Sequence, residues 1–343
     1  MNVTRIGLDL AKQVFQVHGV DQFGKAVLRK QLSRGKLRAF FAQLPRCLVG
    51  MEACGSAHYW ARELAQLGHD VRLMAPQFVA PYRKEQKNDG NDAEAICEAV
   101  ARPNMRFVPV KTVEQQAVLT VHRARQLLVG ERTALVNQVR GLLAEYGIVL
   151  GQGVGQVRRC LPEILEDAEN GLPALAREVF SELHERLRQL DQRAHEYDRR
   201  ITCFVREMPA AQRLMQLEGI GPISATALVA TVGEAREFAN GRQFAAWLGL
   251  VPRQYSSGGK TRHGRITKRG DRYLRTLLVH GARAVLMRSA GRKDPKSQWS
   301  QSVRARRGFN KATVALAAKH ARILWAMLAR AEDYRPALTR QAV

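Results

Sequence analysis

The chain has 343 residues, with 55 Lys and Arg against 31 Asp and Glu, which gives a formal net charge of +24. Its length indicates two or three domains, and its charge indicates a polyanionic partner, which we expect to be nucleic acid. A membrane surface is the competing polyanion, but the sequence lacks an apolar run of about eighteen residues and a signal peptide. We therefore expect a cytoplasmic protein without a membrane partner. The five scattered cysteines include no C-x-x-C pair and predict neither disulfides nor a zinc site.

Residues 1–111 have the pattern of an α/β domain. Three short runs, residues 3–11, 14–20 and 25–32, have the apolar or alternating character of strands. A helix near 34–44, a buried strand at 47–53, a helix near 57–67 and a strand at 70–75 are predicted to follow. Three antiparallel strands followed by alternating helices and parallel strands is the order of the ribonuclease H-like fold.

Two acidic residues are predicted at the ends of buried strands. Asp9 lies within an apolar strand, where a carboxylate costs free energy of desolvation unless it is paired or bound to a metal. Asp9 fits either the metal site of a ribonuclease H-like nuclease or the phosphate-binding turn of an actin-like kinase, but the glycine-rich loops of a kinase are missing. Glu52 follows a second buried strand, and neighbouring strand ends bring such carboxylates to one edge of a sheet.

Asp89 and Asp92 open the next predicted helix. An N-cap at Asn91 with Glu94 three residues later explains Asp92 as a first-turn acid, but it does not explain Asp89. The alternative is that both carboxylates converge on a divalent cation. With Asp9 and Glu52, the four acids predict a site for one or two magnesium ions.

Residues 112–206 are predicted to be helical. A Thr112/Gln115 capping box begins a long amphipathic helix, a glycine-rich break follows, and a second long helix runs from about Pro173. Two such helices indicate an antiparallel coiled-coil arm that serves in dimerisation.

Residues 207–331 form the third predicted domain, and residues 332–343 form a tail. A short helix, the turn Gly219-Ile220-Gly221-Pro222 and a second helix capped by Ser224 have the pattern of a helix-hairpin-helix. In that motif glycine amides approach a DNA phosphate, so Gly219 and Gly221 are candidate contacts. The alternative is an ordinary helical turn.

The segment from Arg253 to Arg275 contains eight Lys and Arg and one acid, Asp271. It is predicted to be a basic loop that holds nucleic-acid backbone. Ser257, followed by two glycines, could attack a phosphodiester if neighbouring cations stabilise the developing charge. The candidate nucleic-acid contacts are Arg253, Lys260, Arg262, Arg265, Lys268, Arg269 and Arg272.

The motifs taken together resemble one family. "IGLDLAK", "MEACG" and "KNDGNDA", followed by "LEGIGPISATALVATVG", "FAAWLGLVPRQYSSGGK" and "ITKRGDRYLRTLLVHGAR", are similar to the DEDD transposases of a bacterial insertion-sequence family related to Piv invertases and bridge-RNA-guided recombinases. The resemblance spans nearly the whole chain. It implies a RuvC-like N-terminal domain, a coiled coil and a C-terminal, mainly helical transposase domain.

The resemblance also implies residue roles and partners. Asp9, Glu52, Asp89 and Asp92 become a tetrad that holds Mg²⁺ or Mn²⁺, and Ser257 becomes the nucleophile, with Ser256 as the fallback. The implied reaction passes through a 5′-phosphoserine linkage to DNA and leaves a free 3′-hydroxyl. The implied partners are target and donor DNA, a structured bridge RNA and further copies of the chain in a dimer or tetramer, acting at the bacterial nucleoid.

Two rivals predict different outcomes. A RuvC-type junction nuclease would hydrolyse DNA with metal ions and would not use the serine. A non-catalytic nucleic-acid-binding protein would tolerate loss of the acids.

Overall fold

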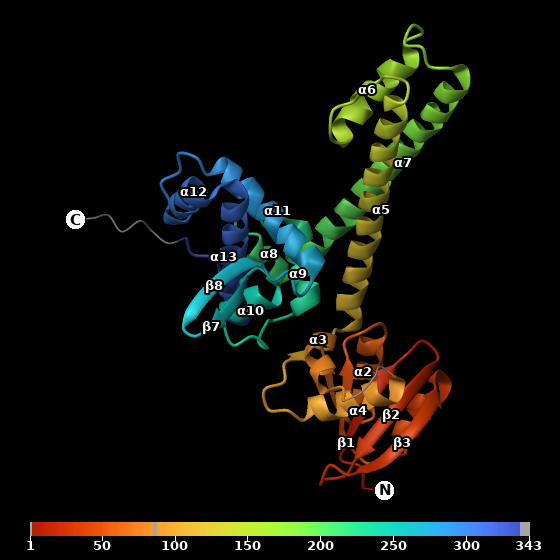
Figure 1. Ribbon diagram of the computed structural model, residues 1–343, viewed down its shortest axis with the longest axis vertical. Coiled ribbons are helices and arrows are strands. Elements are labelled where there is room, and N and C mark those ends of the chain that lie inside the picture. Colours follow the sequence, from red (N-terminus) through yellow and green to blue (C-terminus); the bar gives the residue numbers. More distant parts are fainter. Residues whose placement is uncertain (1, 85–87, 337–343) are drawn as a thin grey trace, which may run out of the picture. The chain divides into compact units, whose positions relative to one another are not determined.

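The computed structural model describes residues 2–84 and 88–336, which fall into two compact units (Figure 1). Unit 1 comprises the described residues up to Val113 together with Ala235–Ala239. Unit 2 comprises Glu114–Glu234 and the described residues from Asn240 onward. Residues 337–343 of the predicted tail lie outside the described residues.

Unit 1 is built around one sheet with the strand order β3-β2-β1-β4-β5-β6. Its strands are β1 (Arg5–Leu10), β2 (Val14–Val20), β3 (Ala26–Ser33), β4 (Leu48–Glu52), β5 (Asp70–Met74) and β6 (Phe107–Val108). Its helices are η1 (Arg34–Lys36), α1 (Leu37–Ala42), α2 (Ala57–Gln66), α3 (Pro76–Val79), η2 (Ala80–Tyr82) and α4 (Asp89–Val100).

The strands and helices predicted for the first 75 residues are confirmed. β1, β2 and β3 form an antiparallel meander, and β4 and β5 are parallel to β1. This arrangement is consistent with the predicted ribonuclease H-like order. The short antiparallel strand β6, which the sequence did not indicate, pairs with β5 and ends the sheet.

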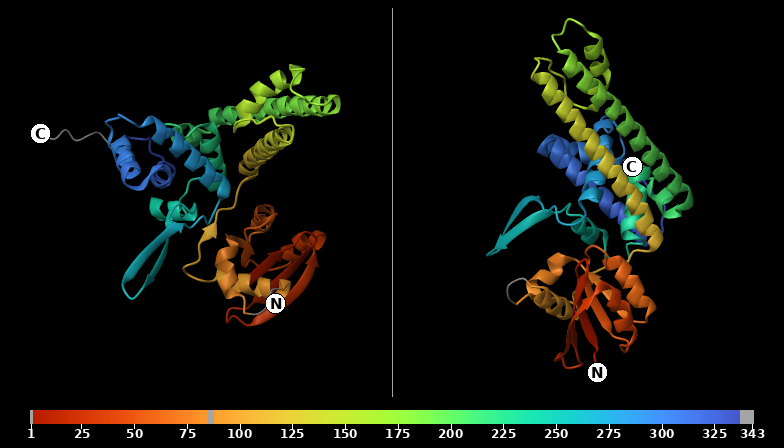
Figure 2. Two further views of the ribbon diagram at one scale, coloured as in Figure 1. Left: turned by 45° about the horizontal axis from the view of Figure 1, so that its top comes forward. Right: turned by 90° about the vertical axis from the view of Figure 1, so that its right-hand side faces the viewer.

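The two faces of the sheet carry different side chains because strand residues alternate. Apolar residues such as Leu8, Phe15 and Met51 face α1 and α2 and form a core with Phe41 and Trp60. α4 packs on the opposite face, against β1, β2 and β4. The side covered by α4 has a smaller apolar core, in which Met74 and Val79 pack with Ile96 and Val100, so unit 1 has helices on both faces of its sheet (Figure 2).

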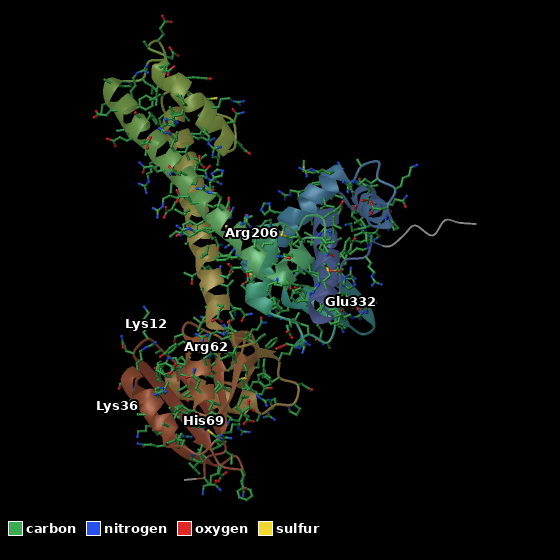
Figure 3. The ribbon with its side chains drawn as sticks, turned by 180° about the vertical axis from the view of Figure 1, so that it is seen from behind. Lys12, Lys36, Arg62, His69, Arg206 and Glu332 are labelled. Atoms are coloured by element: carbon green, nitrogen blue, oxygen red, sulfur yellow. The ribbon has the colours of Figure 1, made fainter. Side chains whose placement is uncertain are left out.

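His69 and Arg62, which are labelled in Figure 3, connect separate segments of unit 1 by hydrogen bonds to backbone groups. The ring of His69 is buried, accepts a hydrogen bond at Nδ1 from the Cys47 amide (3.3 Å) and contacts the Phe41 carbonyl through Nε2 (3.1 Å). Arg62 donates from Nη1 to the carbonyl of Lys111 at 2.6 Å. These bonds satisfy buried backbone groups and hold the end of unit 1 against α2.

Unit 2 begins with a helical arm. It consists of α5 (Val113–Ala144), α6 (Val154–Glu166) and α7 (Ala174–Glu207). α5 and α7 run antiparallel, because Arg125 pairs with Asp198 while Arg132, seven residues on, pairs with Asp191, seven residues back. Apolar residues of all three helices form one core, which includes Leu135, Leu161 and Leu187.

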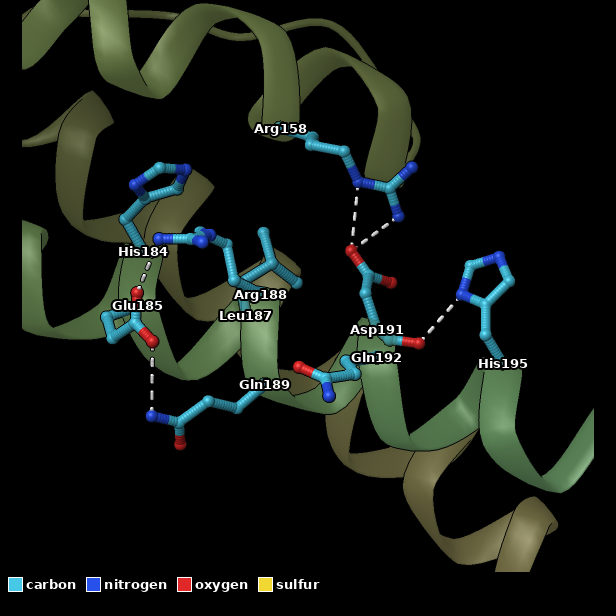
Figure 4. A pocket seen from close by; sticks show the side chains of 9 residues that line it. All are labelled: Arg158, His184, Glu185, Leu187, Arg188, Gln189, Asp191, Gln192 and His195. Atoms are coloured by element: carbon cyan, nitrogen blue, oxygen red, sulfur yellow. Dashed lines mark hydrogen bonds and ion pairs between the residues drawn. The ribbon is translucent and has the colours of Figure 1, made fainter.

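α6 corrects the sequence prediction, which left the segment between the two long helices irregular. Val157 and Leu161 lie four residues apart and are fully buried, which is the helical spacing that could have indicated the helix. The carboxylate of Asp191 accepts from Arg132 of α5 (3.1 Å) and from Nε of Arg158 of α6 (2.9 Å), so one acid of α7 joins the three helices (Figure 4). A pocket of about 390 Å³ lies beside this ion pair.

The rest of unit 2 is mainly helical. Its elements are α8 (Pro209–Leu214), α9 (Pro222–Val232), α10 (Gly241–Trp247), β7 (Pro252–Ser257), β8 (Lys260–Ile266), α11 (Arg272–Arg288), α12 (Pro295–Arg307) and α13 (Phe309–Ala329). α13 packs against α10, α11 and α12. Within the described residues, no helix is both long and apolar enough to cross a membrane.

Candidate functional site

Asp9 and Glu52 lie side by side at the carboxyl ends of two parallel strands. Leu8 of β1 is paired with Met51 of β4, so the next residues, Asp9 and Glu52, are neighbours on one face of the sheet. Both carboxylates act on the same nearby group: burial raises the pKa of the Cys54 thiol, and the charges of Asp9 and Glu52 raise it further. The predicted meeting of these two acids is therefore found in the fold.

Two glycines bring α4 onto the face that carries these acids. A Cβ added to Gly7 would lie 2.0 Å from the carbonyl oxygen of Ala93, and one added to Gly50 would lie 2.7 Å from Cβ of Val100. Any side chain at either position would push α4 away from the sheet. Gly7 and Gly50 lie two residues before Asp9 and Glu52 on their strands, so the helix and the acids share one face.

The first turn of α4 carries Asp89 and Asp92, but its cap differs from the predicted one. The Asn88 side chain accepts from the Asn91 amide at 2.8 Å, and the helix begins at Asp89. The predicted N-cap at Asn91 is wrong because Asn88 has the extended backbone that a capping residue needs. Both acids thus lie in the first turn, where the helix dipole favours a negative charge.

Asp89 and Asp92 have different surroundings. Asp89 is exposed, whereas Asp92 is 8% exposed and accepts from Nε of Arg83 at 2.5 Å. Among residues 2–84 and 88–336, no three His, Cys, Asp or Glu side chains lie close enough together to hold a metal ion. Carboxylate oxygens are the donors that Mg²⁺ and Mn²⁺ prefer, so the chemistry of the four acids fits such an ion. Arg83 engages Oδ1 of Asp92, and a carboxylate has a second oxygen through which it can bind an ion.

Ser257 lies on a β-ribbon, which corrects the prediction of a loop. β7 and β8 pair antiparallel, with Ser257 opposite Lys260, and Gly258 and Gly259 form the connection with φ of 55° and 77°. Two consecutive residues with positive φ make the two-residue turn that suits a hairpin, and Gly-Gly is one of its sequence signals. Every residue of β7 is exposed, and the ribbon extends away from the helices of unit 2 (Figure 2).

The two faces of the ribbon differ in chemistry. Tyr255 is opposite Arg262, so these residues share a face with Ser257 and Lys260. Ser256 lies on the other face, where its hydroxyl accepts from Gln254 at 2.8 Å and donates to Thr261 at 3.4 Å. Ser257 is therefore the serine with cationic neighbours, and Ser256 belongs to a neutral hydrogen-bonded row.

Positive charge is concentrated in this part of the sequence. Residues 242–331 contain 21 Lys and Arg and two acids, Asp271 and Asp294. Each of these acids caps a helix by accepting from a backbone amide, from Leu274 at 2.9 Å and from Ser297 at 2.9 Å. Arg253, Lys260, Arg262 and Arg265 lie on the ribbon, and Lys268, Arg269 and Arg272 lie where it joins α11. This basic surface is suited to contact with a phosphate backbone.

The two glycines of the hairpin between α8 and α9 have unlike surroundings. Gly219 has φ of 84°, and a Cβ there would lie 2.7 Å from the carbonyl oxygen of Gly281 in α11. Gly219 is thus needed for close packing against α11. Gly221 is the N-cap of α9 and has open space beside it, which corrects the predicted cap at Ser224, a buried residue inside the helix.

His122 is a buried residue in unit 2 that the sequence did not single out. Thr226 donates its hydroxyl to the Pro222 carbonyl (2.7 Å), so its oxygen accepts from His122 Nε2 (3.0 Å). His122 Nδ1 then accepts from the Tyr273 hydroxyl at 3.0 Å. A neutral imidazole therefore links α5 to α9 and α11. Burial, followed by the charges of Arg125 and Arg123, lowers its pKa to about 4.

This lowered pKa makes the stability of unit 2 dependent on pH. Between about pH 6.5 and pH 4, His122 is protonated in the unfolded chain but neutral in the folded protein. The free energy of unfolding therefore falls as the pH falls through that window. Between pH 7.5 and 5 the loss from His122 is about 2 kcal/mol. Urea unfolding of wild type and His122→Gln at both pH values is expected to show a smaller loss in the variant. Equal losses would contradict this role.

Matches to known proteins cover almost the entire chain. A model of DEDD transposases of the IS110 type matches residues 6–148, and a model described as the transposase IS116/IS110/IS902 family matches residues 211–298. The chain is 57% identical to a probable family 20 transposase of Pseudomonas aeruginosa, over 98% of this chain and 100% of that protein. It is 42% identical to the transposase of insertion sequence element IS1111A of Coxiella burnetii, over 96% and 91% of the two chains.

A third relative, the transposase of insertion sequence element IS1328 of Yersinia enterocolitica, is 42% identical over 94% of this chain and 96% of its own. These relatives, which match over almost the whole chain, are transposases. The acids at the ends of adjacent strands and the basic helical region agree with that class of protein. The chain belongs to the IS116/IS110/IS902 transposase family, and it is an insertion-sequence transposase of the IS110 type.

Several residues near the site were not predicted. Arg83 follows η2 and is paired with Asp92 of α4. Gln16 is paired with Asp9 across β1 and β2, and Gln31 is paired with Gln16 across β2 and β3. The alternation in "VFQVHGV" indicates that Gln16 and His18 share a face, but only the strand register shows that the face is that of Asp9.

Proposed function

We propose that this transposase cuts and rejoins DNA strands through a covalent serine linkage, guided by an RNA encoded with its element. The observation that carries the proposal is the placement of Asp9 beside Glu52 with the first turn of α4 on the same face. In this proposal unit 1 is a RuvC-like domain, and Asp9, Glu52, Asp89 and Asp92 are the residues that would hold Mg²⁺ or Mn²⁺. A bound divalent ion supplies positive charge that polarises the scissile phosphate and stabilises the leaving oxygen.

Ser257 is the proposed nucleophile. Its Oγ forms a bond to phosphorus while the bond from phosphorus to the 3′-oxygen breaks, giving a 5′-phosphoserine and a 3′-oxygen that takes up a proton. The 3′-hydroxyl of another strand then attacks the phosphoserine and releases the serine, so the number of phosphodiester bonds is conserved. The cationic face formed with Lys260 and Arg262 supports this role, because charge develops on the phosphate oxygens.

The acids and the serine come from different units, and residues 252–266 contain no Asp or Glu. We propose that they meet in a dimer or tetramer assembled on nucleic acid, with the tetrad of one copy acting beside the serine of another. In this proposal residues 112–206 form a dimerising coiled coil, and residues 207–331 form the transposase domain that binds DNA. Gly221, with open space beside it, is the better candidate of the two hairpin glycines for a phosphate contact.

Sequencing the RNA that copurifies with the protein tests the guided mechanism. We expect a structured RNA whose loops are complementary to the target and donor sites that the element joins, because the protein contacts mostly backbone. A strand-exchange assay with that RNA, and with its loops altered, should move the joined sites to match the new loops. Exchange that proceeds equally without RNA would contradict guidance.

A further inference from the structure

The acidic pair belongs to a longer polar row across the sheet. Glu52 lies beside Asp9, Asp9 is paired with Gln16, and Gln16 is paired with Gln31. Directly paired residues project to the same side with Cβ atoms about 5 Å apart. The row therefore continues from the acids over β2 and β3 as two neutral amides. Phe15 and Val17, which alternate with Gln16, are buried in the core on the opposite face.

A pocket of about 290 Å³ lies over this end of the row. Gln16 and Gln31 line its floor with His18 and Arg29, a second directly paired couple, and the first turn of α4 forms a wall. Its volume is at the low end for a small-molecule site, so it suits one small group better than an extended chain. Because Gln16 is paired with Asp9, the pocket is next to the acids.

The polar groups of the pocket have capacity for a ligand. Across the described ranges 2–84 and 88–336, the side chains of Gln16, His18 and Gln31 make no hydrogen bond to another protein group. His18 is only 6% exposed, and burial lowers its pKa, so the ring is neutral at neutral pH. Two amides and a neutral imidazole offer both donors and acceptors, which is the combination that matches the edge of a nucleobase.

The charges at the pocket favour an anionic ligand. Glu94 is its acid, and its carboxylate contacts Lys84 at 3.0 Å and Arg29 at 3.7 Å. Lys30 borders the pocket only through its position in β3, because it is paired with Val17 and its side chain lies over the Phe40 ring of α1 on the opposite face. Two cations, Arg29 and Lys84, against one acid leave a net positive surface beside the neutral amides. A nucleotide, with a polar base and a negative phosphate, matches both features.

We infer that this pocket receives one unpaired nucleotide of the DNA strand being cut, immediately next to the phosphate that a divalent ion would hold at Asp9 and Glu52. Gln16, His18 and Gln31 contact the base and sugar, while Arg29 contacts the adjoining phosphate. These are positioning residues, because they fix the strand and do not touch the reacting atoms. The inference rests on the proposed function, since it assumes that the acids mark the cleavage point.

The test uses the full-length protein with its copurified RNA, with Ca²⁺ in place of Mg²⁺ to slow cleavage, and a DNA substrate with 2-aminopurine at successive positions around the cut site. Fluorescence of this base rises when it leaves the stack. Wild type is expected to raise the fluorescence at one position beside the cut. The double variant Gln16→Ala/Gln31→Ala is expected to lose that rise and to bind the DNA about tenfold more weakly, within the range for a bidentate base contact.

Gln43→Ala/Gln66→Ala is the matched control. Both glutamines are exposed and lie at the ends of α1 and α2, which cover the opposite face of the sheet. The control should behave like wild type, and equal melting temperatures would show that both variants fold. A rise that persists in Gln16→Ala/Gln31→Ala, or that appears only when the label is in the RNA, would overturn the inference. Because the readout is binding, it stands apart from loss of cleavage, which tests the proposed function.

Discussion

Ser257→Ala is expected to abolish the covalent protein–DNA adduct, whereas Ser256→Ala is expected to retain it. The two serines are adjacent, but the ribbon directs them to opposite faces. Ser257 shares its face with Lys260 and Arg262, which can stabilise charge on a phosphate in attack. The Ser256 hydroxyl is held by Gln254 and Thr261.

The measurement is denaturing electrophoresis of protein incubated with DNA labelled on the 3′ side of the break, which is the fragment that keeps the 5′-phosphoserine linkage. Removing a nucleophile costs about 10³-fold or more in rate, so no adduct should appear with Ser257→Ala in the time that wild type needs for completion. Ser256→Ala serves as the matched control, since it removes one hydroxyl from the same exposed ribbon. Normal cleavage by Ser257→Ala without an adduct would favour the hydrolytic nuclease. Loss of the adduct only in Ser256→Ala would identify Ser256, on the other face of the ribbon, as the nucleophile.

Asp9→Asn and Glu52→Gln are each expected to lower strand cleavage by about 10³-fold while leaving DNA binding nearly unchanged. Both substitutions keep the size of the side chain and remove the charge that a divalent ion requires. Most DNA binding should survive because the basic segment from Arg253 to Arg275 belongs to unit 2. This combination separates an enzyme from a non-catalytic binding protein, which would lose neither activity.

Asp70→Asn is the matched control for the acids. Asp70 begins β5, at the amino end of a strand that neighbours β4, and its side chain is 57% exposed and paired with Arg72. The control should cleave at the wild-type rate. Titrating Mn²⁺ into wild type, Asp9→Asn and Asp70→Asn, with binding followed by calorimetry, should show weakened metal binding in Asp9→Asn alone. Wild-type cleavage by Asp9→Asn would remove the acids from the mechanism.

The ion pair between Arg83 and Asp92 bears on both experiments. The carboxylate of Asp92 is 8% exposed, so breaking the pair without a substitute cation leaves a buried charge that costs several kcal/mol. A divalent ion is such a substitute. In the proposed metal site, an ion at Asp92 would compete with Arg83 for this carboxylate, of which Arg83 engages Oδ1.

The sequence by itself determined the strands and helices of the first 75 residues and the acids at the ends of two of these strands. Buried strands have runs of apolar residues, and a charged residue such as Asp9 is conspicuous within one because of its desolvation cost. The concentration of Lys and Arg near Ser257 is also a property of the chain alone. These features depend on composition and local spacing, so no tertiary contact was needed to find them.

Three local features differ from what the sequence predicted: the cap of α4, the helix α6 and the ribbon of β7 and β8. Asn88 caps α4 although Asn91 is the same residue type three positions later, since both satisfy the sequence rule. α6 was missed because the glycines before it and Pro162 within it suggest irregular chain, although Val157 and Leu161 are buried at helical spacing. The ribbon was missed because its residues are polar on both faces, so hydrophobic alternation gives no indication of it.

Only the tertiary structure decided which side chains are neighbours. Register joins Asp9 to Glu52 and Gln16, and it is set by hydrogen bonding between strands distant in sequence. Gly7 and Gly50 must be glycines because α4 packs closely against them, and only the tertiary structure shows this contact. Gly219 has the sequence signature of a phosphate contact, yet it packs against Gly281, more than sixty residues away. A sequence states which groups are available, whereas packing between distant segments determines which of them meet.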